Sequence, residues 1–279
     1  MKFITFDIED WFHILDHPDT AEPHNWSGFE SRIEKGVNTI LDLMDRNQLK
    51  GSFFCLGWIC EKYPHIIKKI NDHGHHIGTH SNLHKLVYNQ NKSEFKKDLK
   101  KSIDLLEHTT GKKIDSYRAP GFSIKKQNLW AFEIMNELGI KYDSSIFPAS
   151  RSHGGIKSFE IDKPVKILYK NDFSIIELPI NTKKILSHKF VFSGGGYFRL
   201  FPKLVLRKLF RQNEYIMTYF HPRDFDYQQP LIPNLNFYRK FKCYYGIKDC
   251  IEKLDIILKE NKFHKITDIN EHELETFKI

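Results

Sequence analysis

The chain has 279 residues, of which 40% are hydrophobic and 28% are charged, and its net charge is +8 with histidine neutral. This composition is typical of a soluble globular protein, and no apolar run approaches the roughly 18 residues of a membrane span. The Lys and Arg residues are scattered among Asp and Glu, which argues against a basic stripe that binds nucleic acid.

Short β-branched or aromatic runs alternate with amphipathic segments along nearly the whole chain. The runs that predict strands are 2–7, 51–56, 75–79, 116–119, 140–144, 175–180 and 215–220. Apolar residues at helical spacing predict helices between them, one with its stripe from Phe29 to Met44 and another from Phe95 to Leu106. A further helix is predicted over 246–261.

This alternation predicts an α/β fold, a single distorted (β/α) barrel of about seven parallel strands. Because no long linker interrupts the pattern, we expect one catalytic domain over residues 1–279. The C-terminal helix and strand, 246–267, would complete the barrel.

The N-terminus and the cysteines suggest where the protein works. The first predicted strand begins at residue 2, and the N-terminus lacks the basic and long apolar regions of a secretory signal. The four cysteines form no Cys-x-x-Cys pair, and Cys55 lies in the apolar run SFFCLG. We therefore expect free thiols and a cytoplasmic location.

Ionisable residues follow the predicted strands at the point where each strand ends. Asp7 ends the first strand, with Glu9 and Asp10 after it, and His80 and His84 follow the third strand. Arg118 and Asp143 lie near the ends of the fourth and fifth strands, and His221 follows the last. Active sites of parallel barrels collect at the carboxyl ends of the strands. The sequence therefore predicts a catalytic site at this rim.

His80 and His84 stand four residues apart in THSNLH (79–84) and, on one helical turn, could bind the same metal ion. A carboxylate from FDIED (6–10) would complete a His/His/acid site with open positions, the pattern of catalytic zinc or a related divalent metal. An isolated pair of this spacing is more often structural, but the acidic cluster at a neighbouring strand end favours the metal. We expect a divalent metal cofactor, zinc before others.

Four motifs in this order resemble those of the polysaccharide deacetylase family, the carbohydrate esterases that include chitin and peptidoglycan deacetylases. They are FDIED (6–10), HSNLH (80–84), RAPGF (118–122) and FHP (220–222). The resemblance implies a distorted barrel and a metal-dependent hydrolase. Such an enzyme removes the acetyl group from an N-acetylated sugar and releases acetate and a free amine.

Two further segments, YDSSIFP (142–148) and GGGYFRLFP (194–202), resemble the branch associated with bacterial exopolysaccharide and surface-glycan synthesis. Whether the sugar is linked to a nucleotide, linked to a lipid or part of an oligomer stays open. The glycines of the second segment lack the context of a phosphate-binding loop and predict a tight loop against the pocket.

The resemblance also implies roles for individual residues. Asp7 would be the general base, paired with Arg118, and His221 would be the general acid. His80 and His84 would be metal ligands.

The third ligand stays open between Glu9 and Asp10, because Ile8 separates acids that are adjacent in the usual motif. Residues two apart on a strand share a face, which favours Glu9 as the partner of Asp7. Asp143 would orient His221.

Several residues near the rim are candidates for contact with the sugar. They are Trp11, Pro120, Gly121, Phe122 and Tyr197. Trp11, with Phe12 and His13, would either form a wall on which the sugar stacks or pack beneath the rim.

The segment 201–213 combines Leu and Phe with Lys and Arg. It predicts a barrel helix that faces the core. The alternative is an interfacial helix that gives peripheral contact with the cytoplasmic face of the membrane and suits a lipid-linked sugar.

Two other functions were weighed against the deacetylase. A metal-free cyclic amide hydrolase of the allantoinase kind would lose the metal histidines, whereas His80 and His84 are present. A catalytically silent glycan-binding protein would lose the base or the acid, whereas Asp7 and His221 are present.

Overall fold

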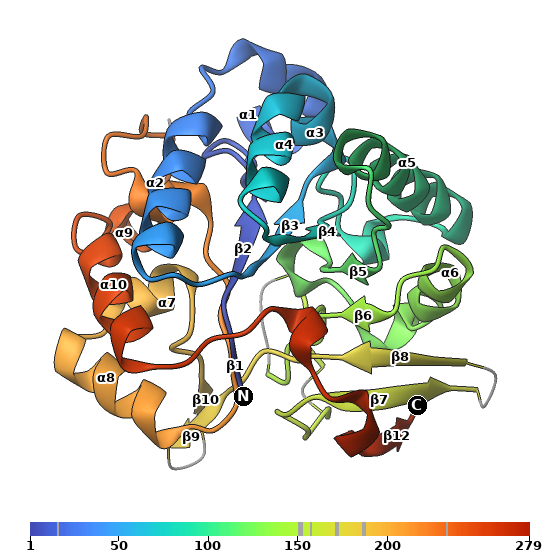
Figure 1. Cartoon of the computed structure of the whole chain (residues 1–279). Coiled ribbons are helices and arrows are strands. Elements are labelled where there is room, and N and C mark those ends of the chain that lie inside the picture. Colours follow the sequence, from blue (N-terminus) through green and yellow to red (C-terminus); the bar gives the residue numbers. More distant parts are fainter. Residues whose placement is uncertain (16, 150–152, 157, 171–172, 186–187, 233) are drawn as a thin grey trace.

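The structure is a computed structural model that describes residues 1–15, 17–149, 153–156, 158–170, 173–185, 188–232 and 234–279. Its centre is an eight-stranded sheet in the order β12-β7-β8-β6-β5-β4-β3-β2 (Figure 1). The strands are β2 (Thr5–Ile8), β3 (Ser52–Cys55), β4 (His76–Thr79), β5 (Ser116–Tyr117), β6 (Tyr142–Asp143), β7 (Val165–Tyr169), β8 (Phe173–Glu177) and β12 (Thr276–Lys278). From β2 to β8 through β6 every neighbour is parallel, and β7 runs antiparallel to β8.

The first strand continues the array beyond the sheet. β1 (Lys2–Phe3) precedes β2 and pairs in parallel with β11 (Ile216–Met217). A bridge between Phe6 and Phe220 extends this pairing, and the Asp7 N–H donates to the Phe220 carbonyl at 2.8 Å. The residue that follows Phe220 is therefore held at the level of Asp7.

The arrangement is a mainly parallel α/β fold consistent with a distorted (β/α) barrel, as predicted. Each of the seven predicted runs from 2–7 to 215–220 overlaps a strand, whereas the strand predicted after the C-terminal helix is only a bridge at His264. On its other side β11 is linked to the segment after β8 through side chains, because Tyr215 Oη donates to the Pro179 carbonyl and Met217 N donates to Asn181 Oδ1.

The sequence did not predict β7, β12, or the antiparallel pair β9 (Lys183–Ile185) and β10 (His188–Phe190). β12 is short and largely exposed, so it lacks the apolar run that marks a buried strand.

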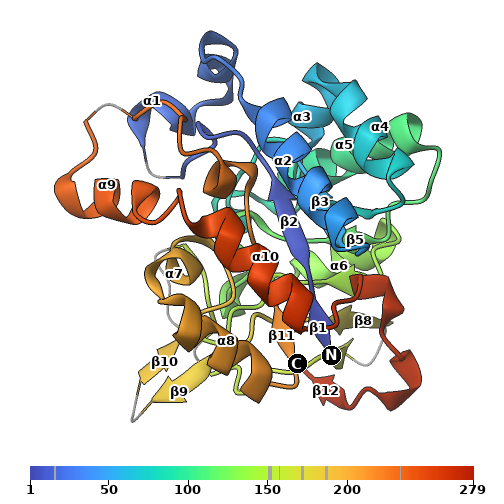
Figure 2. The ribbon, with the colours of Figure 1, turned by 60° about the vertical axis from the view of Figure 1, so that its left-hand side comes forward.

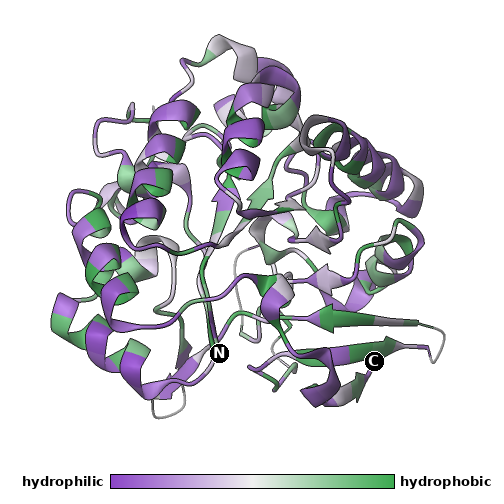
Figure 3. Cartoon of the chain, viewed as in Figure 1, coloured by the Kyte–Doolittle hydropathy of each residue, from purple (hydrophilic) through white to green (hydrophobic). Residues whose placement is uncertain are grey.

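The helices surround the sheet. They are α1 (Pro18–Ala21), α2 (Ile33–Arg46), α3 (Gly57–Lys62), α4 (Pro64–Asp72), α5 (Lys92–Thr110), α6 (Ala131–Glu137), α7 (Gly195–Leu200), α8 (Lys203–Gln212), α9 (Phe237–Tyr244) and α10 (Cys250–Glu260). Figure 3 shows hydrophobic residues along the strands and hydrophilic residues on the outer faces of the helices. Within the described ranges, no helix is both long and apolar enough to cross a bilayer.

The predicted apolar stripes are confirmed, except that Phe29 precedes α2 and is half-buried. α2 buries residues from Ile33 to Met44, and α5 buries residues from Phe95 to Leu106. α2 packs on a 3-10 turn, η5 (Pro222–Phe225). A Cβ at Gly36 would lie 2.5 Å from Pro222 Cβ, so glycine is needed for this close approach.

α8 and α10 lie side by side (Figure 2). Leu206 and Phe210 of α8 are buried, as expected of a barrel helix. Two of its cations pair with α10, Lys203 with Glu252 and Arg207 with Glu260. The predicted helix over 246–261 is α10, and His264 beyond it forms a bridge with Phe3. That residues 1–279 work as one domain stays a prediction.

Candidate active site

A cavity of about 540 Å³ lies where the parallel strands end. Five of the predicted catalytic and metal-binding residues line it: Asp7, Glu9, His80, His84 and His221. Asp7 belongs to β2, the two histidines follow β4, and His221 follows the bridge at Phe220. The parallel register of these strands therefore brings together residues more than 200 positions apart.

Glu9, His80 and His84 are buried, and their ligand atoms all lie within 4.8 Å of one another. His80 Nδ1 lies 2.7 Å from the Arg118 carbonyl oxygen. Since a carbonyl only accepts, Nδ1 carries the proton and Nε2 keeps its lone pair for a ligand.

The chemistry of these donors fits a divalent metal. Burial lowers the pKa of His80 to about 4, so the ring is neutral at neutral pH, as a metal ligand must be. Burial alone would raise the pKa of Glu9, but His84 and His221 outweigh it and hold the pKa well below the usual range. Glu9 Oε2 lies 2.7 Å from His84 Nε2, yet no described residue gives this buried oxygen a hydrogen bond of good geometry.

The two histidines meet in a way that the sequence did not predict. Residues 80–86 form a loop rather than a helical turn, with Ser81 at φ +69° and His84 at φ +53°. The His84 N–H donates to Ser81 Oγ, and the Asp98 carboxylate accepts from the Asn82 N–H. These hydrogen bonds hold the left-handed backbone that brings the ring centroids of His80 and His84 to 5.3 Å.

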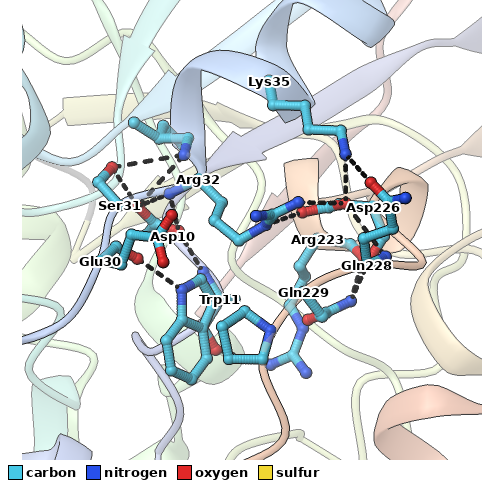
Figure 4. A network of polar contacts seen from close by, with 12 residues as sticks. Asp10, Trp11, Glu30, Ser31, Arg32, Lys35, Arg223, Asp226, Gln228 and Gln229 are labelled. Atoms are coloured by element: carbon cyan, nitrogen blue, oxygen red, sulfur yellow. Dashed lines mark hydrogen bonds and ion pairs between the residues drawn. The ribbon is translucent and has the colours of Figure 1, made fainter.

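Asp10, the other candidate for the third ligand, lies elsewhere. Figure 4 shows its carboxylate among Trp11, Ser31 and Arg32. It accepts from the backbone N–H groups of Trp11 at 2.8 Å and Arg32 at 3.0 Å, and from Ser31 Oγ at 2.6 Å. Arg32 in turn pairs with Asp226. Asp10 therefore binds the N-terminus of α2, and Glu9 is the carboxylate that joins His80 and His84 in the donor set.

Asp7 is fixed by Arg118. Arg118 is fully buried, and its Nη1 donates to Asp7 Oδ1 at 2.7 Å and to Thr5 Oγ1 at 2.7 Å. Its other nitrogens donate to the Ser144 carbonyl and to Ser144 Oγ. With these partners the guanidinium holds the Asp7 carboxylate in one orientation.

His221 lies between carboxylates. Its Nε2 is 3.2 Å from Glu9 Oε1 and 3.9 Å from Asp7 Oδ2, and its Nδ1 is 3.2 Å from Asp224 Oδ2. Burial alone lowers the pKa of His221, but Glu9, Asp224 and Asp7 outweigh it and raise the pKa to about 9. His221 is therefore protonated at neutral pH.

The residue that orients His221 is Asp224, which sequence reasoning missed. Burial opposes its ionisation, but Arg199 and His221 lower the pKa of Asp224 to about 2. Arg199 Nε lies 3.2 Å from Asp224 Oδ1. The signal was present, since an acid three residues after the histidine in FHPRD can accept from its backbone N–H, as it does at 2.9 Å.

The expected role of Asp143 is not supported. Asp143 is fully buried in β6, opposite Glu177 of β8. Burial raises the pKa of both carboxyls, that of Glu177 well above its usual range. Ser145 Oγ donates to Asp143 Oδ1 and accepts from the Ala119 N–H, so Asp143 supports the segment that follows Arg118.

The substrate candidates separate into two groups. Gly121, Phe122 and Tyr197 line the cavity. Pro120 is buried between the lining residues Ala119 and Gly121, and Trp11 is buried with its Nε1 donating to the Glu30 carbonyl. Trp11 therefore packs beneath the rim, which was the second alternative.

Sequence reasoning also missed the cations that line the cavity, namely Arg199, Arg223, Arg239 and Lys242. The prediction of a tight loop at 194–196 is wrong, because a helix begins within this segment. Gly195 begins α7, which presents Tyr197 to the cavity.

Two family models match the chain. The model described as polysaccharide deacetylase matches residues 17–142, and a domain of unknown function (DUF3473) matches residues 144–271. The first match includes His80, His84 and Arg118, whereas Asp7, Glu9 and His221 lie outside it.

Curated relatives match parts of the chain. A peptidoglycan-N-acetylglucosamine deacetylase of Bacillus cereus is 34% identical over 95 residues, which are 34% of this chain and 34% of that protein. A peptidoglycan deacetylase of Helicobacter pylori is 30% identical over 136 residues, which are 47% of this chain and 42% of that protein. The matched segments thus span less than half the length of these relatives.

Solved structures share the fold over nearly the whole chain. A Mycobacterium smegmatis protein designated a polysaccharide deacetylase has a TM-score of 0.64 at 19% identity, covering 97% of this chain and 88% of that one. A CE4 family pseudoenzyme of Bacillus anthracis has a TM-score of 0.51 at 14% identity, covering 100% and 69%. Residues 17–142 thus match the polysaccharide deacetylase domain, and nearly the whole chain shares the fold of solved structures that carry this name.

Proposed function

We propose that the protein is a metal-dependent hydrolase that removes the acetyl group from an N-acetylated sugar and releases acetate and a free amine. One observation carries the proposal. An acid paired with arginine, a histidine placed between carboxylates and a His/His/Glu donor set face the same cavity. Buried histidine and carboxylate donors suit zinc better than magnesium or calcium.

Each side chain has a chemical task in this proposal. A divalent ion held by Glu9, His80 and His84 would polarise the acetamide carbonyl and make the attacking water more acidic. Asp7 accepts the proton of that water through Oδ2, since Oδ1 is held by Arg118. His221 donates its proton to the leaving nitrogen, and Asp224 keeps its ring in place.

The matched relatives act on peptidoglycan, as their names state, which supports a glycan substrate for this chain. We further propose a role in bacterial exopolysaccharide or surface-glycan biosynthesis. The two segments that suggest this role, 142–148 and 194–202, contribute residues to the site. Ser144 and Ser145 hold the Arg118 segment, and Tyr197 lines the cavity.

We also propose that the protein works in the cytoplasm on a nucleotide-linked, lipid-linked or oligomeric precursor. The four cysteines support this location, because all are free and Cys55, Cys60 and Cys250 are buried. Free thiols persist in reducing compartments.

The test measures metal content and acetate release on the same preparations. The wild type should contain one divalent metal and release acetate from N-acetylglucosamine oligomers, with the amine product located by mass spectrometry. His80→Ala with His84→Ala should lose both metal and activity. The matched control is His73→Ala, a histidine of the same segment that pairs with Asp45 on the surface and should keep both. Stoichiometric metal in the double variant would refute the donor set.

A further inference from the structure

Exposed aromatic residues gather on and around α9. We call them, with one leucine, the aromatic face: Tyr227, Leu231, Phe237, Tyr238, Phe241 and Tyr245. Phe237 is 87% exposed and Tyr238 is 64% exposed. None of the described residues of α9 is buried. Phe241 and Tyr245 pack ring against ring, with centroids 4.7 Å apart, and exposed apolar side chains gathered on one helix mark a contact surface.

The segment that carries this face has charged residues of a single sign. The sequence from 227 to 248 contains Arg239, Lys240, Lys242 and Lys248 but no Asp or Glu. Lys242 Nζ lies 4.7 Å from the Tyr238 ring, and Lys248 Nζ lies 5.9 Å from the Tyr227 ring. On α8, by contrast, Lys203 and Arg207 pair with glutamates of α10.

The aromatic face lies beside the mouth of the catalytic cavity. Arg239 and Lys242 of α9 line that cavity, and Arg239 Nη2 donates to the Leu15 carbonyl. Arg199 donates to the carbonyls of Lys242 and Tyr245, which ties the end of α9 to α7. Figure 2 shows α9 at the periphery of the molecule, away from the sheet.

We propose that the aromatic face and its cations dock on the surface of an anionic lipid bilayer. Phenylalanine and leucine side chains gain free energy in the acyl boundary, and lysine heads bind anionic lipid. A soluble acidic glycan would satisfy the cations but would leave Phe237 and Leu231 in water. The helix that contacts the membrane is then α9 rather than α8, because the apolar side of α8 is buried in the core.

This docking proposal rests on the proposed function and adds to it the class of substrate. With α9 on the bilayer, the cavity opens at the membrane surface. The substrate class that fits this position is an N-acetylated sugar carried on a lipid through an anionic phosphate, within reach of Arg239 and Lys242.

The experiment is flotation of the full-length protein with vesicles of phosphatidylglycerol and phosphatidylcholine, or of phosphatidylcholine alone, at low salt. The wild type should bind only the anionic vesicles, and 1 M salt should release it. Lys240→Gln with Lys248→Gln should weaken binding about 25-fold, since each cation contributes roughly fivefold. Phe237→Ser with Phe241→Ser should also release the protein.

Matched controls come from α8. Lys208→Gln with Arg211→Gln removes the same charge, and Leu204→Ser with Val205→Ser removes an exposed apolar pair. Both should bind vesicles like the wild type. Thermal unfolding of every variant checks that it is folded.

Three results would overturn the docking proposal. They are no binding of the wild type to anionic vesicles, release by the α8 variants instead, or α9-dependent binding of a soluble acidic polysaccharide in place of vesicles. Acetate release from a soluble oligomer is measured in parallel and should be unchanged in all α8 and α9 variants. If the protein releases acetate but does not bind vesicles, only the docking proposal is refuted. If it binds vesicles but releases no acetate, only the proposed deacetylase function is refuted.

Discussion

Asp10 and Glu9 are neighbours in the sequence, but the structure gives them different tasks, and paired substitutions separate these tasks. Asp10→Ala removes the acceptor of the Trp11 and Arg32 N–H groups and of the Ser31 hydroxyl. Loss of a helix cap costs up to about 2 kcal/mol, and a buried N–H left unpaired costs about 1–3 kcal/mol. We expect a loss of about 3 kcal/mol in the free energy of unfolding.

In a chain of this size, such a loss lowers the unfolding temperature by roughly 6–12 °C. The metal content should stay at one per chain, because Asp10 is directed at α2. Glu9→Gln should lower the affinity for metal and leave the stability nearly unchanged. It removes a ligand, so affinity should fall by more than the roughly 10–100-fold that outer partners cost, with little change in unfolding temperature.

Calorimetry on the metal-free proteins measures stability without the contribution of bound metal. Titration with zinc, followed by elemental analysis, measures affinity and stoichiometry. Asp10→Asn is the conservative control, since it keeps an acceptor oxygen and should lose less stability than Asp10→Ala. The reasoning fails if Asp10→Ala loses metal at unchanged stability, or if Glu9→Gln keeps the affinity of the wild type.

Three further predictions concern the catalytic groups. Asp7→Asn should retain metal but lose most turnover, and near-wild-type kcat would show that Asp7 is not the base. His221→Ala should lower kcat by about 10²–10⁴-fold with the metal content unchanged; a smaller effect would remove it as the acid. Asp224→Asn removes a carboxylate that favours the imidazolium, so the pKa of His221 should fall from about 9 toward 6.5. Because the acid must be protonated, the alkaline limb of the pH–rate profile should move to lower pH, and NMR titration of His221 should show the same direction.

The sequence by itself determined the local elements and the edge of the sheet that carries the chemistry. The apolar stripe of α2 follows from a 3.6-residue period, and the buried runs that become β2, β3 and β4 follow from composition and length. Parallel strands present their carboxyl ends at one edge, so polar residues after several strands indicated a shared site.

Tertiary structure decided which polar residues meet. Asp10 leaves the site because its partners belong to the start of α2, 21 to 23 positions along the chain. Asp224 replaces Asp143 at His221 because a 3-10 turn brings its carboxylate back to the imidazole. Sequence spacing does not encode such contacts, because they depend on the loops that follow the strands.

The same reason applies to the pair His80 and His84 and to α9. His80 and His84 converge through left-handed backbone at Ser81 and His84, which helical spacing does not predict. The amphipathic patterns of α8 and α9 are similar in kind, yet only α8 buries its apolar side. A period in the sequence shows that a helix has an apolar face; what covers that face depends on the neighbours that the fold places against it.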